Sequence, residues 1–279
     1  FQEVTNKTLE MIVHWQRVGF VHGVMNTDNM SILGLTIDYG PYGWLEGFDL
    51  GWTPNTTDKK HKRYRYGNQP TIGLWNLYQL ANALYPLIDE AAPLEEILEK
   101  YQRDFKTESL HMMRSKLGLT LAKKNDSLLI ESLEKNLQAS ETDMTIFFRK
   151  LSDFRKEFPE QGIKLVENAF YKIDEIHDDL LNNWQQWFSE YAKRLKEEPI
   201  PFNERQKKMN KVNPKYVLRN YMAQLAIDKA ETNDSSLIEE LYQILKKPYE
   251  EQPEFEHWFA KRPEWARHKV GCSMLSCSS

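Results

Sequence analysis

The stretch from His22 to Gly40, HGVMNTDNMSILGLTIDYG, decides how the rest of the chain is interpreted. It sets Asp28 directly before Asn29 and places Asp38 further along the same stretch. Asp and Asn side chains often form turns by hydrogen bonding to their own backbone. They also supply the oxygen ligands that Mg²⁺ prefers. The spacing of these polar residues decides between the two interpretations, a turn or a metal site.

That spacing matches a motif of the protein kinases. Their catalytic loop, H-R-D-x-x-x-x-N, supplies a base and a magnesium-binding Asn, and a later D-F-G supplies a second metal-binding Asp. Here His22 stands at the His, Asn29 at the Asn, and Asp38 begins the tripeptide D-Y-G. Val24 occupies the position of the base, and Asp28 is the nearby carboxylate that could replace it. The sequence therefore predicts Asn29 and Asp38 as metal ligands, with His22 buried and structural.

Composition limits the class of protein. The 279 residues are 41% hydrophobic and 28% charged, which is enough for one sizeable core or two smaller ones. No apolar run approaches the roughly 18 residues of a membrane-spanning helix. The net charge of -4 argues against a nucleic-acid binder, and the basic run 59–63 is interpreted as a solvated loop. We expect a soluble protein of the cytoplasm, or of the mitochondrion in a eukaryote, that binds neither membrane nor nucleic acid.

Periodicity predicts a mostly helical chain. An apolar stripe predicts a helix before the polar stretch, with Thr5 as N-cap and Gly19 as its end. A long ordered loop is expected from Gly40 to Pro70, and helices from 71 to 245 interrupted by a linker over 197–215. The large aromatics of the helical region are expected to pack in the core or on the surface, without a cofactor role: Trp75, Phe147, Trp184 and Trp187.

The chain resembles the selenoprotein O family beyond this first stretch. The resemblance continues through RYGNQP (65–70), WNL (75–77), FFRKLS (147–152), NPKYVLRNY (213–221), PYEEQPEF (248–255) and the terminal CSS. It implies a kinase-like fold that binds ATP in reverse, so that AMP passes to a Ser, Thr or Tyr hydroxyl of a protein substrate. It further implies that Asp28 is the proton acceptor, that Asn29 and Asp38 bind Mg²⁺ or Mn²⁺, and that Asp38 lies close to the nucleotide.

The family's strand-rich lobe, with its Gly-rich loop and phosphate-binding Lys, has no counterpart in the 21 residues before His22. We therefore expect residues 1–245 to form a kinase-like C-terminal lobe, with a short β-hairpin at the metal-binding loop and a family-specific helical extension. Residues 246–279 are expected to form a C-terminal tail. On this interpretation the chain is part of a longer protein and is inactive alone, because both lobes supply catalysis.

Two other functions stay open. Val24 in place of the base favours a non-catalytic pseudokinase that binds partners, whereas the two metal ligands oppose it. An ordinary kinase that transfers the γ-phosphoryl group is the other alternative. Both cysteines, Cys272 and Cys277, lie near the chain end, which excludes a disulfide scaffold. Cys277 stands where some members of the family carry selenocysteine, so a reversible redox role is expected for it, with Cys272 as one candidate partner.

Overall fold

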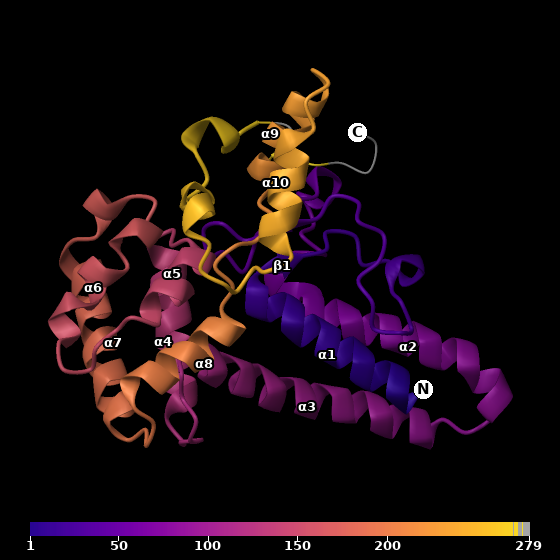
Figure 1. Cartoon of the computed structure of the whole chain (residues 1–279). Helices are drawn as coiled ribbons and strands as arrows, with labels where there is room; N and C mark the ends of the chain where they lie inside the picture. Colours follow the sequence, from indigo (N-terminus) through magenta and orange to yellow (C-terminus); the bar gives the residue numbers. More distant parts are fainter. Residues whose placement is uncertain (270, 273–274, 276–279) are drawn as a thin grey trace. The chain divides into compact units, whose positions relative to one another are not determined.

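The computed structural model is mostly helical, as predicted, and describes residues 1–269, 271–272 and 275 (Figure 1). The chain divides into two compact units. The first contains residues 1–43 and 50–112 together with Leu275, and the second contains residues 44–49 and 113–272. No helix within the described part combines the length and the apolar character needed to cross a membrane. The predicted boundary at residue 245 stays a prediction.

Three helices build the first unit: α1 (Gln2–Val18), α2 (Gln69–Ile88) and most of α3 (Ala92–Lys116). Helix α1 ends at Gly19, whose φ of 74° is left-handed, so the predicted stop is confirmed. The predicted N-cap is wrong, because α1 starts at Gln2 and Thr5 lies buried inside its first turns. An apolar stripe defines the buried face of a helix better than it defines the helix end.

Helices α1 and α2 pack directly against each other (Figure 1). Their contact depends on Gly73, where an added Cβ would lie 2.2 Å from Cδ1 of Ile12. Helix α3 adds Tyr101, whose hydroxyl donates to the carbonyl of Pro70 over 3.1 Å. Burial of this side chain raises the pKa of Tyr101 well above its usual range. The core of this part is formed by Leu77, Ala81, Leu94, Leu98 and Tyr101.

The predicted long loop is ordered by short elements. Strands β1 (Phe20–Val21) and β2 (Gly43–Trp44) form a small antiparallel sheet, which confirms two short paired strands around the predicted metal loop. The predicted β-hairpin is wrong in its connection, because residues 22–42 join the strands in place of a tight turn. Two 3₁₀ turns follow, Thr56–Asp58 and Tyr66–Asn68. The Asp58 carboxylate, which is buried, accepts from the backbone N–H groups of Arg63 and Tyr64, at the end of the basic run, at 2.8 and 2.7 Å. The basic run 59–63 itself is exposed, as predicted.

The second unit consists of α4 (Asp126–Ala139), α5 (Met144–Leu151), α6 (Gly162–Leu165), α7 (Asp178–Lys196), α8 (Phe202–Val212), α9 (Asn220–Ala230) and α10 (Ser236–Leu245). The 3₁₀ turns in it are Pro159–Gln161, Glu167–Ala169, Ile173–Glu175, Pro253–Trp258 and Glu264–Ala266. Helix α8 corrects the predicted linker over 197–215. Prolines flank α8 at 201 and 214 instead of interrupting it, and Pro is tolerated at helix ends.

Aromatic side chains fill the core between α5 and α7. The rings of Phe147 and Trp184 lie 5.4 Å apart, and those of Trp187 and Tyr191 stack at 5.0 Å. All four side chains are buried, which confirms packing as the role of Phe147, Trp184 and Trp187. Trp75 lies on the surface of the first unit, 40% exposed, with the Arg63 guanidinium 4.6 Å from its ring centre. The buried aromatics and the surface Trp75 therefore both pack as predicted.

A six-residue segment, Trp44–Asp49, belongs to the second unit although the chain on both sides of it belongs to the first. Phe48 N–H donates to the Thr142 carbonyl over 2.8 Å, and Met144 N–H donates to the Glu46 carbonyl over 3.0 Å. Arg262 pairs with the Glu46 carboxylate at 2.7 Å. Backbone pairing therefore binds this segment to the start of α5, and a largely buried ion pair binds it to Arg262.

Candidate functional site

The predicted site lies between β1 and β2, where the chain has little regular structure. Asp28 and Asn29 lie on a single 3₁₀ turn, Thr27–Asn29. The Asp28 side chain is exposed and that of Asn29 is half-buried. Asn29 donates through Nδ2 to the Val24 carbonyl over 3.0 Å, which leaves its Oδ1 as the free acceptor of the amide. The turn thus presents a carboxylate and an amide oxygen side by side.

His22 connects this turn to the segment that carries Asp38. Its ring Nε2 lies 2.8 Å from the Ile37 carbonyl, one residue before Asp38, and its Nδ1 accepts from Val24 N–H at 3.4 Å. Burial lowers the pKa of His22 below its ordinary value. The neutral ring donates through Nε2 and accepts through Nδ1, which satisfies both contacts. The prediction of a buried structural His22 is confirmed, at 1% exposure.

Asp38 has an unusual backbone conformation. Its φ is 54°, in the left-handed region that Asp tolerates better than most residues. Gly40 N–H donates to the Asp38 carbonyl over 2.8 Å, which tightens the turn behind it. The Asp38 side chain is exposed, and the Tyr39 ring packs 6.4 Å from Phe20 of β1. Backbone bonds and ring packing therefore fix Asp38 while its carboxylate stays available.

The ligand chemistry suits a hard divalent cation held in part by a nucleotide. Among the described residues, no group of three or more His, Cys, Asp or Glu side chains is arranged to hold a metal ion. Mg²⁺ in nucleotide sites usually takes one or two side-chain ligands and completes its shell with phosphate and water oxygens. The Asn29 amide and the Asp38 carboxylate are both hard oxygen donors. The pair fits a metal that arrives with its nucleotide.

Sequence reasoning missed a set of buried amides that hold the backbone of this stretch. Gln69 accepts from His22 N–H at 3.0 Å and donates to the Phe20 carbonyl at 2.9 Å. Asn55 donates to the Gly23 carbonyl at 3.1 Å. Asn76 donates to the Met25 carbonyl at 3.0 Å. We call Gln69, Asn55 and Asn76 the amide cradle. Gln69 lies within the matching RYGNQP stretch, but nothing in the sequence indicates where these amides point.

The backbone at Gly23 passes very close to the backbone of Pro41. Gly23 has a φ of 80°, and an added Cβ would lie 2.1 Å from the Pro41 carbonyl oxygen. Only glycine combines this conformation with this contact at low cost. Position 23, between His22 and the base position, therefore requires glycine because its backbone passes so close to that of Pro41.

Substitution of Gln69 by leucine is expected to destabilise the first unit. It leaves His22 N–H and the Phe20 carbonyl without partners in a buried place, which costs about 2 kcal/mol or more in the free energy of unfolding. Urea denaturation measures this difference. Gln79→Leu makes the same chemical change at a half-buried position of the same helix, where we expect less than about 0.5 kcal/mol. Equal unfolding midpoints for the two variants would contradict the cradle.

Of the two cysteines, Cys272 lies within the described residues. Cys272 is a buried free thiol within the core of the second unit, at 5% exposure. Burial raises the pKa of the Cys272 thiol, and both features disfavour a reactive cysteine. Cys277 lies outside the described residues. Leu275, two residues before it, accepts from Thr56 N–H over 2.8 Å. The redox role stays a prediction.

Comparison with known proteins identifies close relatives. A family model described as Protein adenylyltransferase SelO matches residues 1–246. The chain is 60% identical over 280 residues to Protein nucleotidyltransferase YdiU of Flavobacterium johnsoniae. It is 52% identical to the proteins of that name from Rhodopirellula baltica, over 291 residues, and Aromatoleum aromaticum, over 281 residues. The alignments cover 100% of this chain but only 54%, 54% and 53% of those relatives. The chain spans about half the length of the curated relatives it matches.

Proposed function

The chain belongs to the SelO family of protein adenylyltransferases, and on that basis we propose that it carries the metal-binding and proton-accepting part of such an enzyme. The reaction moves AMP from ATP to a Ser, Thr or Tyr hydroxyl of a protein. The observation that carries this proposal is a chain of hydrogen bonds through His22 and Val24. The His22 ring contacts the Ile37 carbonyl next to Asp38 and accepts from Val24 N–H, and the Val24 carbonyl in turn accepts from Asn29. We use "full-length protein" for a chain of the relatives' length that contains these residues.

Each residue of the site has one role in this proposal. Asn29 and Asp38 hold Mg²⁺ or Mn²⁺, which when bound neutralises phosphate charge and orients ATP. Asp38 lies close to the nucleotide. Asp28 is exposed on its turn and accepts the proton of the incoming hydroxyl. The amide cradle holds the backbone of the loop that carries Asp28 and Asn29, so that the carboxylate keeps its position during the reaction.

The chemical step is a displacement at the α-phosphorus of ATP. The hydroxyl oxygen of the substrate forms a bond to that phosphorus as its proton passes to the Asp28 carboxylate. The bond from the α-phosphorus to the bridging oxygen breaks, and pyrophosphate leaves with the electron pair. The substrate ends as a phosphodiester with AMP. Val24 at the usual base position is consistent with a base displaced to Asp28.

The same proposal covers the fold. We interpret residues 1–245 as a kinase-like C-terminal lobe with a helical extension and residues 246–279 as its tail. The family model, which reaches residue 246, supports the first boundary. Strands β1 and β2 around the metal loop support the kinase-like arrangement. A strand-rich lobe with a phosphate-binding Lys would then be supplied by the full-length protein.

The test is the fate of the labelled phosphate. Full-length protein incubated with ATP labelled at the α-phosphate is expected to transfer label to protein and to release pyrophosphate. The same assay on the 279-residue chain is expected to transfer no label, because in this proposal the strand-rich lobe of the full-length protein holds the other phosphates. Transfer of label from the γ-position alone would refute the proposal and support a kinase. Absence of both, with ATP still bound, would favour a pseudokinase that binds partners.

A redox role for Cys277 belongs to this proposal as well. The pairing of Leu275 with Thr56 supports it, because Asn55 next to Thr56 is part of the amide cradle. Leu275 is therefore connected through Thr56 and Asn55 to the loop that carries Asp28. In this role Cys277 modulates the site without joining the transfer chemistry, and Cys272 stays a candidate partner.

A further inference from the structure

The basic run 59–63 has no role in the proposed function, although it stands out in an acidic chain. Four of its five residues are Lys or Arg, whereas the whole chain has a net charge of -4. All five side chains are exposed. Among the described residues, none of its four cations forms an ion pair with a carboxylate. Crowded cations without counter-charges attract an anionic partner.

The backbone of the basic run is ordered before any partner binds. The buried Asp58 carboxylate accepts from the N–H groups of Arg63 and Tyr64, and the Asp58 carbonyl accepts from Lys62 N–H over 2.6 Å. Lys62 has a left-handed φ of 49°. Asn68 donates through Nδ2 to the Arg63 carbonyl over 2.6 Å. A loop that is already ordered loses less entropy on binding than a flexible loop does.

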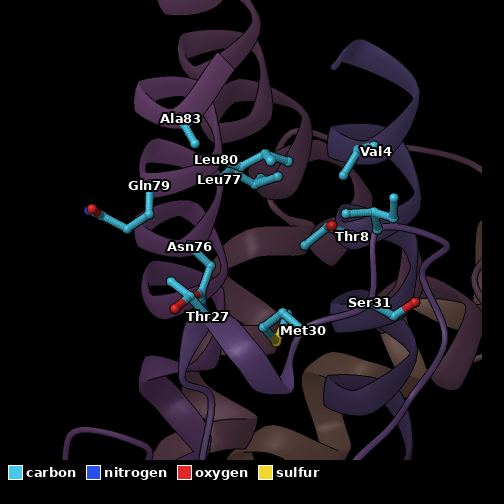
Figure 2. Close-up of a pocket in the computed structure, with 11 residues that line it drawn as sticks. Val4, Thr8, Thr27, Met30, Ser31, Asn76, Leu77, Gln79, Leu80 and Ala83 are labelled. Atoms are coloured by element: carbon cyan, nitrogen blue, oxygen red, sulfur yellow. The ribbon is translucent and has the colours of Figure 1, made fainter. Parts of the chain in front are cut away.

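Neighbouring residues of α2 support both the basic run and the turn that carries the proposed proton acceptor. The Arg63 guanidinium lies 4.6 Å from the centre of the Trp75 ring. The next residue, Asn76, donates to the Met25 carbonyl over 3.0 Å. Figure 2 shows Asn76 at the same end of a pocket as Thr27, the first residue of the turn. One helix therefore positions the basic run and the turn together.

A hydrogen bond also joins the end of the basic run to this turn directly. The Tyr64 hydroxyl, one residue after the run, donates to Oδ1 of Asn26. The Asn26 carbonyl accepts from Asn29 N–H over 3.1 Å and so closes the turn. Asp28 lies between these two asparagines in the sequence. The basic run is thus attached to the loop at which the hydroxyl of a protein substrate is proposed to react.

The surroundings of the basic run favour an acidic polypeptide over other anions. Carboxylates and phosphates both pair with Lys and Arg. In the proposed function the phosphates of ATP are held by the metal at Asn29 and Asp38, whereas Asp28 receives the protein hydroxyl. A nucleic acid is disfavoured because the net charge of -4 repels a long polyanion. The Arg63 guanidinium also occupies a face of the Trp75 ring on which a base would stack.

We propose that the basic run binds acidic residues next to the hydroxyl that receives AMP, so that the protein substrates are acidic around the modified Ser, Thr or Tyr. The inference rests on the proposed function for its link to AMP transfer. Binding of an acidic peptide to the run does not depend on that function. A binding test and a transfer test therefore distinguish a failure of one from a failure of the other.

Two triple variants with the same change in charge serve both tests. The first replaces three lysines of the basic run: Lys59→Gln, Lys60→Gln and Lys62→Gln. The control replaces three exposed lysines of the second unit: Lys193→Gln, Lys196→Gln and Lys207→Gln. All six positions are exposed, so neither variant is expected to unfold the chain. A difference between the variants therefore depends on where the charge is lost.

The binding test follows a fluorescent oligoglutamate peptide by anisotropy, with the 279-residue chain and with the full-length protein. The variant of the basic run is expected to bind it about tenfold more weakly, because three exposed ion pairs of modest strength are lost. The control variant should bind normally, and salt should weaken all binding. Equal binding by the two variants would overturn the inference. Tighter binding of an oligothymidylate of equal charge would replace it with a nucleic-acid site.

The full-length protein adds a further outcome to the binding test. The peptide is expected to bind it with the same dependence on the basic run. Binding by the 279-residue chain alone would mean that another part of the longer protein covers the run, and this result would also overturn the inference. Titration with MgATP should give the same affinity for both variants. A loss of MgATP affinity confined to the variant of the run would assign the run to nucleotide phosphates instead.

The transfer test uses the full-length protein with ATP labelled at the α-phosphate. The probe is a peptide library with a central Ser, Thr or Tyr and randomised flanking residues. Labelled peptides are expected to be enriched in Asp and Glu, and the enrichment should disappear in the variant of the basic run and persist in the control. Labelling without any acidic preference would refute the inference while supporting the transferase. No labelling by the unsubstituted protein would instead count against the proposed function.

Discussion

Replacement of Asp28 by alanine in the full-length protein is expected to slow AMP transfer on the order of 10²- to 10⁴-fold, the usual contribution of a general base. Binding of MgATP is expected to persist, because Asn29 and Asp38 hold the metal without it. Transfer of the α-phosphate label gives the rate, and titration calorimetry gives the affinity. The two measurements together separate a proton acceptor from a metal ligand.

Two variants make the Asp28 result specific. Asp28→Asn keeps the size of the side chain and removes its basicity, so it should be about as slow as the alanine variant. Asp174→Ala removes another exposed Asp from a three-residue 3₁₀ turn, Ile173–Glu175, and should leave the rate unchanged. An Asp28→Ala enzyme that transfers AMP at the original rate would show that another group takes the proton.

Replacement of Asp38 by alanine is expected to weaken binding of MgATP itself. Loss of groups that merely support metal ligands costs about 10- to 100-fold in metal affinity, so loss of a ligand should cost at least that much. Calorimetric titration of the full-length variant with MgATP measures the effect. A higher concentration of free Mg²⁺ should restore part of the affinity. Undiminished binding would place the metal elsewhere.

The backbone at Asp38 requires a separate control. Its φ of 54° is tolerated by Asp and Asn but is less favourable for Ala, so Asp38→Ala combines a lost carboxylate with strain. Asp38→Asn keeps a side chain suited to this conformation and removes the charge. If charge on the ligand is the reason for binding, the Asn variant should also bind MgATP weakly. Recovery of full affinity in Asp38→Asn would attribute the alanine result to strain.

The candidate site residues could be predicted because a loop motif is defined by the number of residues between its members, and this number is read directly from the sequence. His22, Asn29 and Asp38 could be aligned with a known motif, and the burial of His22 followed from its position there. The end of α1 was also predictable, because Gly19 adopts a left-handed conformation that glycine reaches without the steric cost of a side chain. Local rules were sufficient in each of these cases.

The amide cradle and α8 were not predictable from local rules. A buried Gln or Asn has the same sequence signature as an exposed one, and the partners of Gln69 lie 47 and 49 positions away. Helix α8 is polar along most of its length, and the prolines around it suggested a linker. Its register depends on Met209 and Arg205, which are buried by tertiary packing. Long-range contacts decided both features.

The segment Trp44–Asp49 limits how this protein can be divided. A shortened chain that ended at residue 112 would keep Asp28, Asn29 and Asp38, but its six residues of 44–49 would face solvent with unpaired backbone groups and a lone Glu46. A piece that began at residue 113 would lack the segment that bonds to Thr142 and Met144. Neither unit can therefore be excised as one continuous length of chain, and functional dissection has to proceed by point substitution.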